Sequence, residues 1–260
     1  MDHLDKVRAS FTEQAGQFAQ ADLTLSDPVY LEWMVASLPL SAADRVLDVA
    51  AGTGLLARAL APHITQIIAL DATPAMLAEG EKAARESGLI NLTFQGGTAE
   101  TLPFGADEFE LVTCRFALHH FAEPERPIDE MIRVCRPGGH VALIDLVSPD
   151  DPQLAASHNR LETLRDPAHA RALARYELES ALKQRGLTMA TVKVRDVPVN
   201  VDRWLELTRT SDEMSAMIRN ELMTEVNGGP ATGMWPFIQD NALHFKQTWA
   251  IVVGRKLKGY

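Results

Sequence analysis

Short runs of apolar residues alternate, along the first half of the chain, with stretches in which apolar residues recur every three or four positions. The short runs predict five strands, at 45–50, 66–70, 91–95, 109–114 and 139–145. The periodic stretches predict three helices, at 54–61, 74–87 and 124–135. Strands that alternate with helices are typical of a parallel sheet with helices on both faces, so we predict a doubly wound α/β fold.

The first 40 residues read as two helices rather than as part of the sheet. Apolar residues at helical spacing predict a helix over 7–19. A second helix follows, with Asp27 or Ser26 as its N-cap and Pro28 in its first turn. We therefore expect a helical N-terminal lid over 1–40.

The pattern changes after Leu146, where longer helical stretches replace the short alternation. We predict three further helices, at 153–165, 170–186 and 200–226. Alternation with a period of two at 191–197 predicts a half-exposed edge strand, and 247–254 is a last strand. We assign 41–147 to the core and 148–260 to the remainder of the same domain, with helical insertions.

Composition narrows the class of protein. The 260 residues are 46% apolar and 23% charged, which is usual for one large globular domain. A net charge of −10 argues against nucleic-acid binding, which normally needs a clustered basic surface. No apolar run is long enough to span a bilayer, and the acidic start 1–5 does not resemble a signal peptide, so we expect a cytoplasmic protein.

The two cysteines, Cys114 and Cys135, do not form a CxxC pair. A structural zinc site is therefore not predicted, and both cysteines are interpreted as small buried hydrophobic residues.

A glycine-rich turn is the most informative feature of the chain. An apolar strand containing Asp48 leads into Gly52 and Gly54, and Ala57 completes a spacing that also fits a dinucleotide fingerprint. A carboxylate at the rim of such a turn would repel a pyrophosphate, which is bound by bare backbone N–H groups. Asp48 instead favours an ammonium group, or an ordered polar network beneath one. A nucleoside that carries an amino acid, such as S-adenosylmethionine, suits this charge pattern.

The second predicted strand ends in Asp71, about 20 residues past the glycine turn. A carboxylate at this strand end is placed to accept hydrogen bonds from ribose hydroxyls.

Four segments carry a family resemblance: Val46-Leu47-Asp48-x-x-x-Gly52-x-Gly54, Leu70-Asp71-Ala72-x-x-x-Met76-Leu77, Ala99-Glu100-x-Leu102-Pro103-Phe104 and Arg133-Val134-x-Arg136-Pro137-Gly138-Gly139. In their order they resemble the class I S-adenosylmethionine-dependent methyltransferases, of the ubiquinone/menaquinone methyltransferase-like (UbiE-type) small-molecule branch. The resemblance implies a Rossmann-like sheet of seven strands, mostly parallel, with an antiparallel last strand. It covers the chain to about residue 147 and is weaker in the last 110 or so residues, which in such proteins select the substrate.

The resemblance also implies how S-adenosylmethionine, and its product S-adenosylhomocysteine, would be held. The Asp48 position and the turn containing Ala50, Gly52 and Gly54 serve the methionine end. The Asp71 position binds the ribose hydroxyls.

The same resemblance places Ala72 and Met76 along the adenine. The segment with Thr98, Ala99 and Glu100 should wrap it, although many relatives carry an aspartate at the Thr98 position, so Ala99 and Glu100 would share the role here.

Two further groups are expected near the donor. The resemblance implies that the Arg115 backbone faces the methionine moiety. Phe18, with Phe11 and Trp33, either forms a lid over the sulfonium or packs in the interior.

Adjacent histidines, His119 and His120, follow the fourth predicted strand, at the edge where open α/β sheets bind ligands. Histidine is the natural base near neutral pH, so we expect one of the pair to face the substrate as a base. No metal site is predicted, because acids at suitable spacing are not evident. The segment 158–169 is either a wall of the acceptor pocket or a surface helix.

The sequence also leaves two roles open for three aromatic residues of the second half. Trp204, Trp235 and Phe237 either line a roof over the acceptor or belong to the core.

The resulting hypothesis is methyl transfer from S-adenosylmethionine to a small aromatic or conjugated molecule, at oxygen, carbon or nitrogen. One alternative is a protein that binds the same cofactor for non-methylating chemistry or sensing. Another is a nicotinamide-dependent oxidoreductase that uses the glycine fingerprint. The expected partner is the small methyl acceptor, with no nucleic acid and no membrane span; a homodimer is left open.

Overall fold

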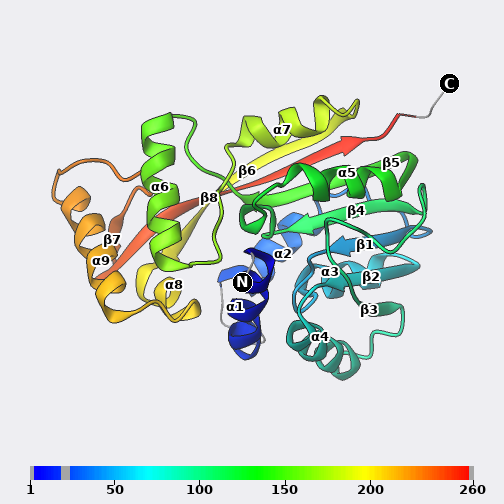
Figure 1. The fold of residues 1–260 in the computed structure, drawn as a ribbon, viewed down its shortest axis with the longest axis horizontal. Helices are drawn as coiled ribbons and strands as arrows, with labels where there is room; N and C mark the ends of the chain where they lie inside the picture. Colours follow the sequence, from blue (N-terminus) through cyan, green and yellow to red (C-terminus); the bar gives the residue numbers. More distant parts are fainter. Residues whose placement is uncertain (1–2, 19–23, 258–260) are drawn as a thin grey trace.

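The structure is a computed structural model that describes residues 3–18 and 24–257. Its centre is one sheet, in the order β3-β2-β1-β4-β5-β8-β6, with β7 paired to β8 (Figure 1). The strands are β1 Arg45–Val49, β2 Gln66–Asp71, β3 Leu92–Gly96, β4 Phe109–Arg115, β5 Cys135–Leu146, β6 Thr188–Asn200, β7 Phe237–Gln239 and β8 Ala242–Arg255. The first five run parallel, and β8 is antiparallel to both of its neighbours β5 and β6.

The central strands are apolar on both faces because helices cover both. Along β1, Val46 belongs to one hydrophobic cluster and the next residue, Leu47, belongs to the other. In β2, Ile67 and Leu70 are divided between the clusters in the same way. Successive side chains of a strand point to opposite faces, so a nearly continuous apolar run fills two cores at once.

Helices form the outer layers. On one face, α2 and α3 contribute to the cluster that contains Val46, and α4 packs on β2 and β3. On the other face, α5 and α7 contribute to the cluster that contains Leu47. The bounds are α2 Pro28–Val35, α3 Leu55–Leu60, α4 Pro74–Glu86, α5 Glu125–Val134 and α7 Arg175–Lys183. Single-turn 3₁₀ helices occur at Thr24–Ser26, Ala61–His63 and Leu118–His120.

The second half of the chain extends the sheet sideways. Strands β6 and β8, of 13 and 14 residues, continue past the parallel strands, and α6, α8, α9 and β7 gather on this extension (Figure 1). These helices are α6 Pro152–Arg165, α8 Val201–Leu207 and α9 Asp212–Val226. Trp204 and Phe245 anchor the extension, with ring centroids 4.8 Å apart.

The N-terminal helix α1 (His3–Phe18) lies between the parallel core and the extension (Figure 1). The predicted end of this helix at Ala19 falls outside the described residues. The prediction for α2 is confirmed, since the Asp27 side chain accepts a hydrogen bond from the Val29 N–H at 2.8 Å and Pro28 begins the helix.

The predicted fold class is confirmed, with one more strand than expected. The additional strand β7 forms a hairpin with β8 through Asp240 and Asn241, whose φ values of 51° and 60° are those of a type I′ turn.

The helix expected over 200–226 is interrupted and forms α8 and α9. Arg209 has a φ of 52° between them, and the Ser211 hydroxyl accepts from the Met214 N–H at 3.3 Å to cap α9.

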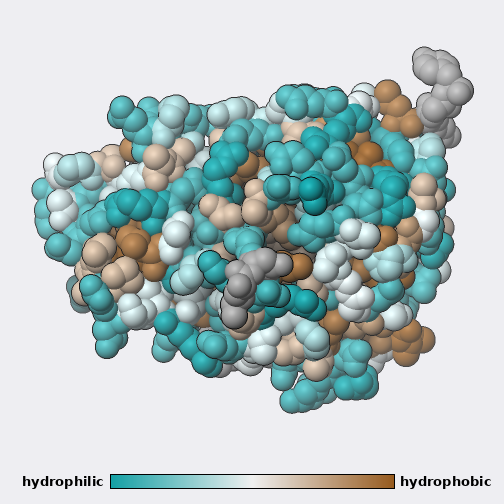
Figure 2. Space-filling model, viewed as in Figure 1, coloured by the Kyte–Doolittle hydropathy of each residue, from teal (hydrophilic) through white to brown (hydrophobic). Residues whose placement is uncertain are grey.

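Other expectations concern burial and the surface. Cys114 and Cys135 are free and buried, as predicted, and burial raises the pKa of both thiols, that of Cys135 to about 12. The face of the molecule that carries α1 is mainly hydrophilic, with small hydrophobic areas between (Figure 2). Within 3–18 and 24–257, every helix is too short or too polar to cross a membrane.

Two glycines in helices provide a test of the packing. A Cβ at Gly80 in α4 would lie 2.4 Å from the Phe94 ring and 2.8 Å from the Thr53 carbonyl oxygen. We expect Gly80→Ala to lower the free energy of unfolding by about 1–3 kcal/mol through overpacking. A Cβ at Gly16 in α1 would meet nothing within 4 Å. Gly16→Ala should therefore raise the free energy of unfolding by about 0.5–1 kcal/mol, because alanine is more favourable than glycine in a helix. Chemical denaturation measures both, and changes of equal sign would contradict the packing.

Candidate active site

The turn after β1 is built on left-handed backbone. Ala50, Gly52 and Gly54 have φ values of 52°, 57° and 67°. Glycine adopts such values without strain, whereas Ala50 holds a conformation that costs a non-glycine residue free energy. A Cβ at Gly54 would lie 2.8 Å from the Phe94 ring, so this position requires glycine for packing as well.

Asp71 connects this turn to the end of β2. One carboxylate oxygen accepts a hydrogen bond from the Gly52 N–H, and the other accepts from the Thr73 N–H, each at 2.8 Å. Burial raises the pKa of Asp71, although these backbone donors oppose the rise by stabilising the carboxylate. The side chain thus fixes the spacing of two loops while its residue remains in the wall of a cavity.

A first cavity of about 900 Å³ opens at this edge of the sheet. It lies between the glycine turn, the end of β2, the segment 97–100 and the loop after β4, and α1 covers it. Eleven of the residues that the sequence singled out line it: Phe11, Phe18, Ala50, Gly52, Asp71, Ala72, Met76, Ala99, Glu100, Arg115 and His120.

Asp48, Gly54 and Thr98 do not line the first cavity. Gly54 caps α3 with its backbone, and Thr98 forms an isolated bridge with Thr101. Asp48 lies below the turn with 1% of its surface exposed, and its carboxylate accepts a hydrogen bond from the Thr113 hydroxyl at 2.6 Å. The sequence allowed two surroundings for Asp48, an ammonium group or an ordered polar network. In the structure Asp48 belongs to a buried polar network.

Burial raises the pKa of Asp48 to about 6, and the Thr113 hydroxyl and Arg115 limit the rise. Burial also lowers the pKa of Arg115 to about 10. The Arg115 guanidinium donates to the Met34 sulfur at 3.2 Å and to the Leu25 carbonyl oxygen. Its side chain therefore fastens the segment that leads into α2.

Helix α1 closes the first cavity through a few specific contacts. Arg8 Nε donates to the Ala72 carbonyl oxygen at 2.9 Å, and His3 Nε2 lies 2.6 Å from the His120 carbonyl oxygen. The Phe11 ring packs edge-on against His120, with centroids 4.9 Å apart. Phe11 also lines the cavity, so α1 forms part of its wall.

Trp33 does not line either cavity. The guanidinium of Arg195 lies over its ring at 5.9 Å, so of the two interpretations left open for Trp33 the structure has the packed one.

A second cavity of about 1300 Å³ adjoins the first. The two share part of their lining: Phe11, Phe18, Leu25, Phe116 and His120. The rest of the second cavity is built mainly from the extension, with Trp204, Trp249, Arg165, Asp166 and Gln247 among its lining residues.

Of the three aromatic residues proposed for a roof, Trp204 lines the second cavity. Neither Trp235 nor Phe237 lines it. Trp235 is 43% exposed, and Phe237 stacks on His244 with ring centroids 5.7 Å apart.

The two histidines after β4 have different partners. His119 lines the second cavity, and its Nδ1 lies 2.6 Å from an Asp145 carboxylate oxygen. His120 lines both cavities, and its Nδ1 lies 3.0 Å from the carbonyl oxygen of Ala168. Burial lowers the pKa of His120 well below its usual value. Burial has the largest single effect on His119 and opposes its charge, but the attraction and hydrogen bond of Asp145, together with the attraction of Glu162, outweigh it and raise the pKa.

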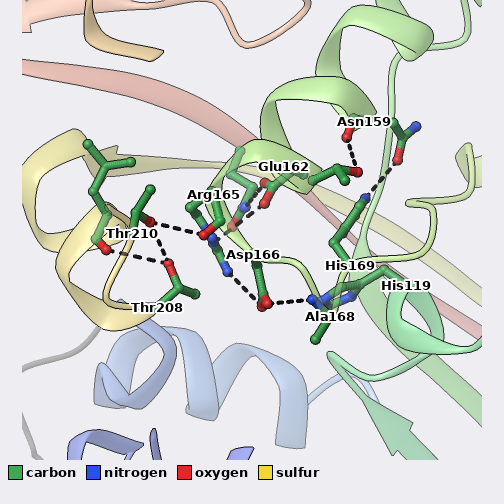
Figure 3. A network of polar contacts seen from close by, with 12 residues as sticks. His119, Asn159, Glu162, Arg165, Asp166, Ala168, His169, Thr208 and Thr210 are labelled. Carbon is green, nitrogen blue, oxygen red and sulfur yellow. Dashed lines mark hydrogen bonds and ion pairs between the residues drawn. The ribbon is translucent and has the colours of Figure 1, made fainter. Parts of the chain in front are cut away.

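A buried polar network supports the second cavity (Figure 3). Arg165 lies between two carboxylates, 3.5 Å from Glu162 and 3.6 Å from Asp166. The other oxygen of Asp166 accepts from the Ala168 N–H at 2.9 Å, and Ala168 in turn bonds His120. These contacts hold Arg165 and Asp166, of the segment 158–169, in the lining of the second cavity.

Sequence reasoning missed Asp145 and Gln247. Asp145 lies near the carboxyl end of a parallel strand, as Asp71 does, so the same signal could have identified it. Gln247 bonds Glu162 at 3.2 Å and accepts from the Trp249 ring N–H at 2.8 Å, and this contact across the extension carries no local sequence signal.

Known proteins share this architecture. Residues 46–139 match a family described as a methyltransferase domain. The uncharacterized methyltransferase YcgJ of Bacillus subtilis is 36% identical over 173 residues, which are 66% of this chain and 68% of that protein. The crystal structure of YcgJ matches with a TM-score of 0.80 and 31% identity, over 88% of this chain and 98% of that one. The chain belongs to the class I S-adenosylmethionine-dependent methyltransferases.

A further relative of this methyltransferase is the UbiE protein of Ectopseudomonas mendocina, described as a ubiquinone/menaquinone biosynthesis C-methyltransferase. It is 30% identical over 158 residues, which are 58% of this chain and 62% of that protein. The resemblance to the UbiE-type branch seen in the sequence motifs is thereby confirmed.

The residues of the first cavity fit the methyl donor of this family. The open face of Gly52, where a Cβ would meet nothing within 4 Å, leaves room at the turn. The Asp71 carboxylate in the wall retains lone pairs for hydroxyl donors, and Met76 and Ala99 give an apolar flank. Within the described residues, no group of three or more histidine, cysteine or acidic side chains is arranged to hold a metal ion.

The burial of Asp48 predicts a pH dependence of stability. Its pKa of about 6 in the folded protein exceeds the ordinary 3.8, so the folded state binds the proton more tightly and the free energy of unfolding decreases as pH rises through this interval. Asp48→Asn removes the buried charge. We expect it to raise the free energy of unfolding by up to about 3 kcal/mol near pH 8, and by little near pH 4. Denaturation at the two pH values measures this; an equal effect at both would contradict it.

Proposed function

We propose that this methyltransferase binds S-adenosylmethionine in the first cavity and transfers its methyl group to a small aromatic or conjugated acceptor in the second. The observation that carries the proposal is the shared wall of the two cavities, where Phe11, Phe18, Phe116 and His120 line both. A transferable group held at such a wall is accessible from either side. Methyl transfer requires such an approach of two ligands, and holding them in line is a large part of catalysis.

On this proposal the residues of the first cavity bind the donor as the family resemblance implies. Asp71 accepts hydrogen bonds from the ribose hydroxyls, and Ala72 and Met76 lie along the adenine. Ala99 and Glu100 take the place of the aspartate that many relatives carry at position 98. When bound, the donor supplies a methyl group already activated on a sulfonium.

The turn and the residues below it serve the methionine end. The Gly52 turn and the Arg115 backbone contact it, while the buried Asp48 contributes a negative field from beneath the turn. Phe18 and Phe11 exclude water from the region between the cavities, which strengthens electrostatic interactions there.

The second cavity supports the choice of acceptor. Phe11, Phe18, Phe116, Trp204 and Trp249 line it, and such walls suit a flat, apolar body. The names of relatives, among them a UbiE-type C-methyltransferase, agree with a conjugated ring system. One of the histidines, His119 or His120, then acts as the base if the acceptor must lose a proton.

Binding of the donor tests the first half of the proposal. Isothermal titration calorimetry with S-adenosylmethionine and with S-adenosylhomocysteine should show one site per chain, and NAD should give no heat. Heat with NAD alone would support the oxidoreductase alternative. A methyl-labelled donor offered with a set of conjugated acceptors separates transfer from a purely structural use of the cofactor, since the latter gives binding without labelled product.

Asp71→Asn tests the ribose assignment. The amide has one acceptor oxygen instead of two, and its NH₂ group would oppose a backbone N–H of Gly52 or Thr73. We expect the affinity for S-adenosylhomocysteine to fall about 10- to 100-fold, which corresponds to about 1–3 kcal/mol. Asp150→Asn removes the same charge from an exposed loop and should leave the affinity unchanged. Equal affinities for the two variants would contradict the assignment.

A further inference from the structure

Asp145 is a third carboxylate at the edge of the sheet where the parallel strands end, and it makes contacts unlike those of Asp48 and Asp71. One of its oxygens lies 2.6 Å from His119 Nδ1 and accepts from the Leu146 N–H at 2.8 Å. The other accepts from the His119 backbone N–H at 3.2 Å. Asp145 therefore holds both the ring and the backbone of one histidine, and it is 2% exposed.

This contact determines which nitrogen of His119 is available. A carboxylate accepts hydrogen bonds, so the neutral imidazole carries its proton on Nδ1 and has its lone pair on Nε2. No described residue hydrogen-bonds Nε2, and His119 lines the second cavity. Its free nitrogen is thus the one that can take a proton from a bound acceptor.

His120 is in a different position. Its Nδ1 donates to the neutral carbonyl of Ala168, and its ring packs against Phe11 at the wall between the cavities. Among the described residues no carboxylate hydrogen-bonds its ring, and burial lowers its pKa well below the usual value. His120 is therefore suited to form the wall, and His119 is suited to accept a proton.

The charged and titratable groups around His119 come from several elements. Asp145 from β5 and Glu162 from α6 favour its charged form, whereas burial, which has the largest effect, and Arg165 oppose it. Three other histidines face it: His120, His158 and His169. The net result is a raised pKa, because Asp145 both attracts the charge and accepts its hydrogen bond.

We propose that the acceptor presents a hydroxyl group to Nε2 of His119, that the methyl group is transferred to this oxygen, and that Asp145 is the positioning residue for His119. This inference rests on the proposed function of the two cavities. An amine is nucleophilic without a base, whereas a hydroxyl becomes a good nucleophile only as it loses its proton. Arg165, Asp166 and Gln247 also line this cavity, and their polar groups suit an oxygen function better than a C–H group.

The O–H bond of the acceptor breaks, and its proton passes to Nε2 of His119. An oxygen lone pair forms the new O–CH₃ bond while the electron pair of the old S–CH₃ bond stays on sulfur. The positive charge of the donor thus ends on His119, beside the Asp145 carboxylate, until the proton leaves to solvent.

A first experiment follows His119 directly and does not depend on turnover. Histidine ¹⁵N NMR of the complex with S-adenosylhomocysteine is titrated with pH, and the His119 signals are identified by their loss in His119→Gln. We expect the neutral ring to be protonated on Nδ1, and Asp145→Asn to lower its pKa. A neutral ring protonated on Nε2, or an unchanged pKa in Asp145→Asn, would overturn the role of Asp145.

A second experiment uses 4-nitrophenol, whose ionisation is visible by absorbance, added to the same complex. Proton transfer to His119 should produce bound phenolate at a pH where the free phenol is largely protonated. The signal should disappear in His119→Gln and persist in His63→Gln, which changes an exposed histidine that lines neither cavity. An absent signal at saturating probe, or an equal signal in His119→Gln, would overturn the assignment.

Transfer itself is measured with methyl-labelled S-adenosylmethionine and two matched probes, 4-nitrophenol and 4-nitroaniline. We expect label on the phenol oxygen, a loss of at least about 100-fold in His119→Gln, and about 10-fold in Asp145→Asn. The rising limb of the pH–rate profile should move to lower pH in Asp145→Asn, a shift that a merely structural role would not cause. Label on the aniline alone, or no label on the phenol, would overturn the hydroxyl assignment.

Calorimetry distinguishes a failure of the proposed function from a failure of the hydroxyl inference. His119→Gln and Asp145→Asn should bind S-adenosylhomocysteine as the wild type does. If the wild type fails to bind it, the proposed function is wrong. If the wild type binds it and methylates only the amine, the proposed function stands and the hydroxyl inference is wrong.

Discussion

The structure of the site depends on the two hydrogen bonds that the Asp71 carboxylate accepts from the backbone N–H groups of Gly52 and Thr73. These groups belong to loops that follow β1 and β2, so a single side chain sets the distance between the strand ends. Carboxylate oxygens form strong, short hydrogen bonds with such donors, and each oxygen keeps a lone pair for a ligand. The carboxylate that would bind the donor is therefore also the one that shapes its cavity.

The same edge of the sheet concentrates buried charge, which is unfavourable for stability. Burial raises the pKa of both Asp48 and Asp71, which means that their charged forms are less stable in the folded protein than in water. The left-handed backbone of Ala50 and Phe116, both in the wall of the first cavity, adds conformational strain. Strained backbone and destabilised charges in one place are typical of a functional site, where binding requires groups that stability alone would not retain.

The fold was largely predictable because its signals are local. The apolar runs of β1 and β2 and the turn chemistry of Asp27 and Pro28 each act within a few residues. The same holds for Asp71, since the carboxyl end of a strand can be identified from the sequence. The hairpin of β7 and β8 was missed although Asp240 and Asn241 favour a two-residue turn, and the break between α8 and α9 was missed because both halves share one helical periodicity.

The second cavity could not be predicted in the same way. Its walls come from α1, the loop after β4, α6, α8 and β8, which are far apart in the sequence and meet only because β6 and β8 extend past the core. The His119–Asp145 pair spans 26 residues, and the contact between Gln247 and Glu162 spans 85. No rule of sequence spacing relates the members of either pair. The adjacent histidines could therefore be recognised in the sequence, but the contact with Asp145, which makes His119 differ from His120, could not.

A crystal structure with S-adenosylhomocysteine bound would test the central claim most directly. Our account predicts the ribose on the Asp71 carboxylate and the sulfur at the wall formed by Phe11, Phe116 and His120, facing the second cavity. A ligand bound outside the first cavity, or one whose sulfur faces away from the second, would contradict it.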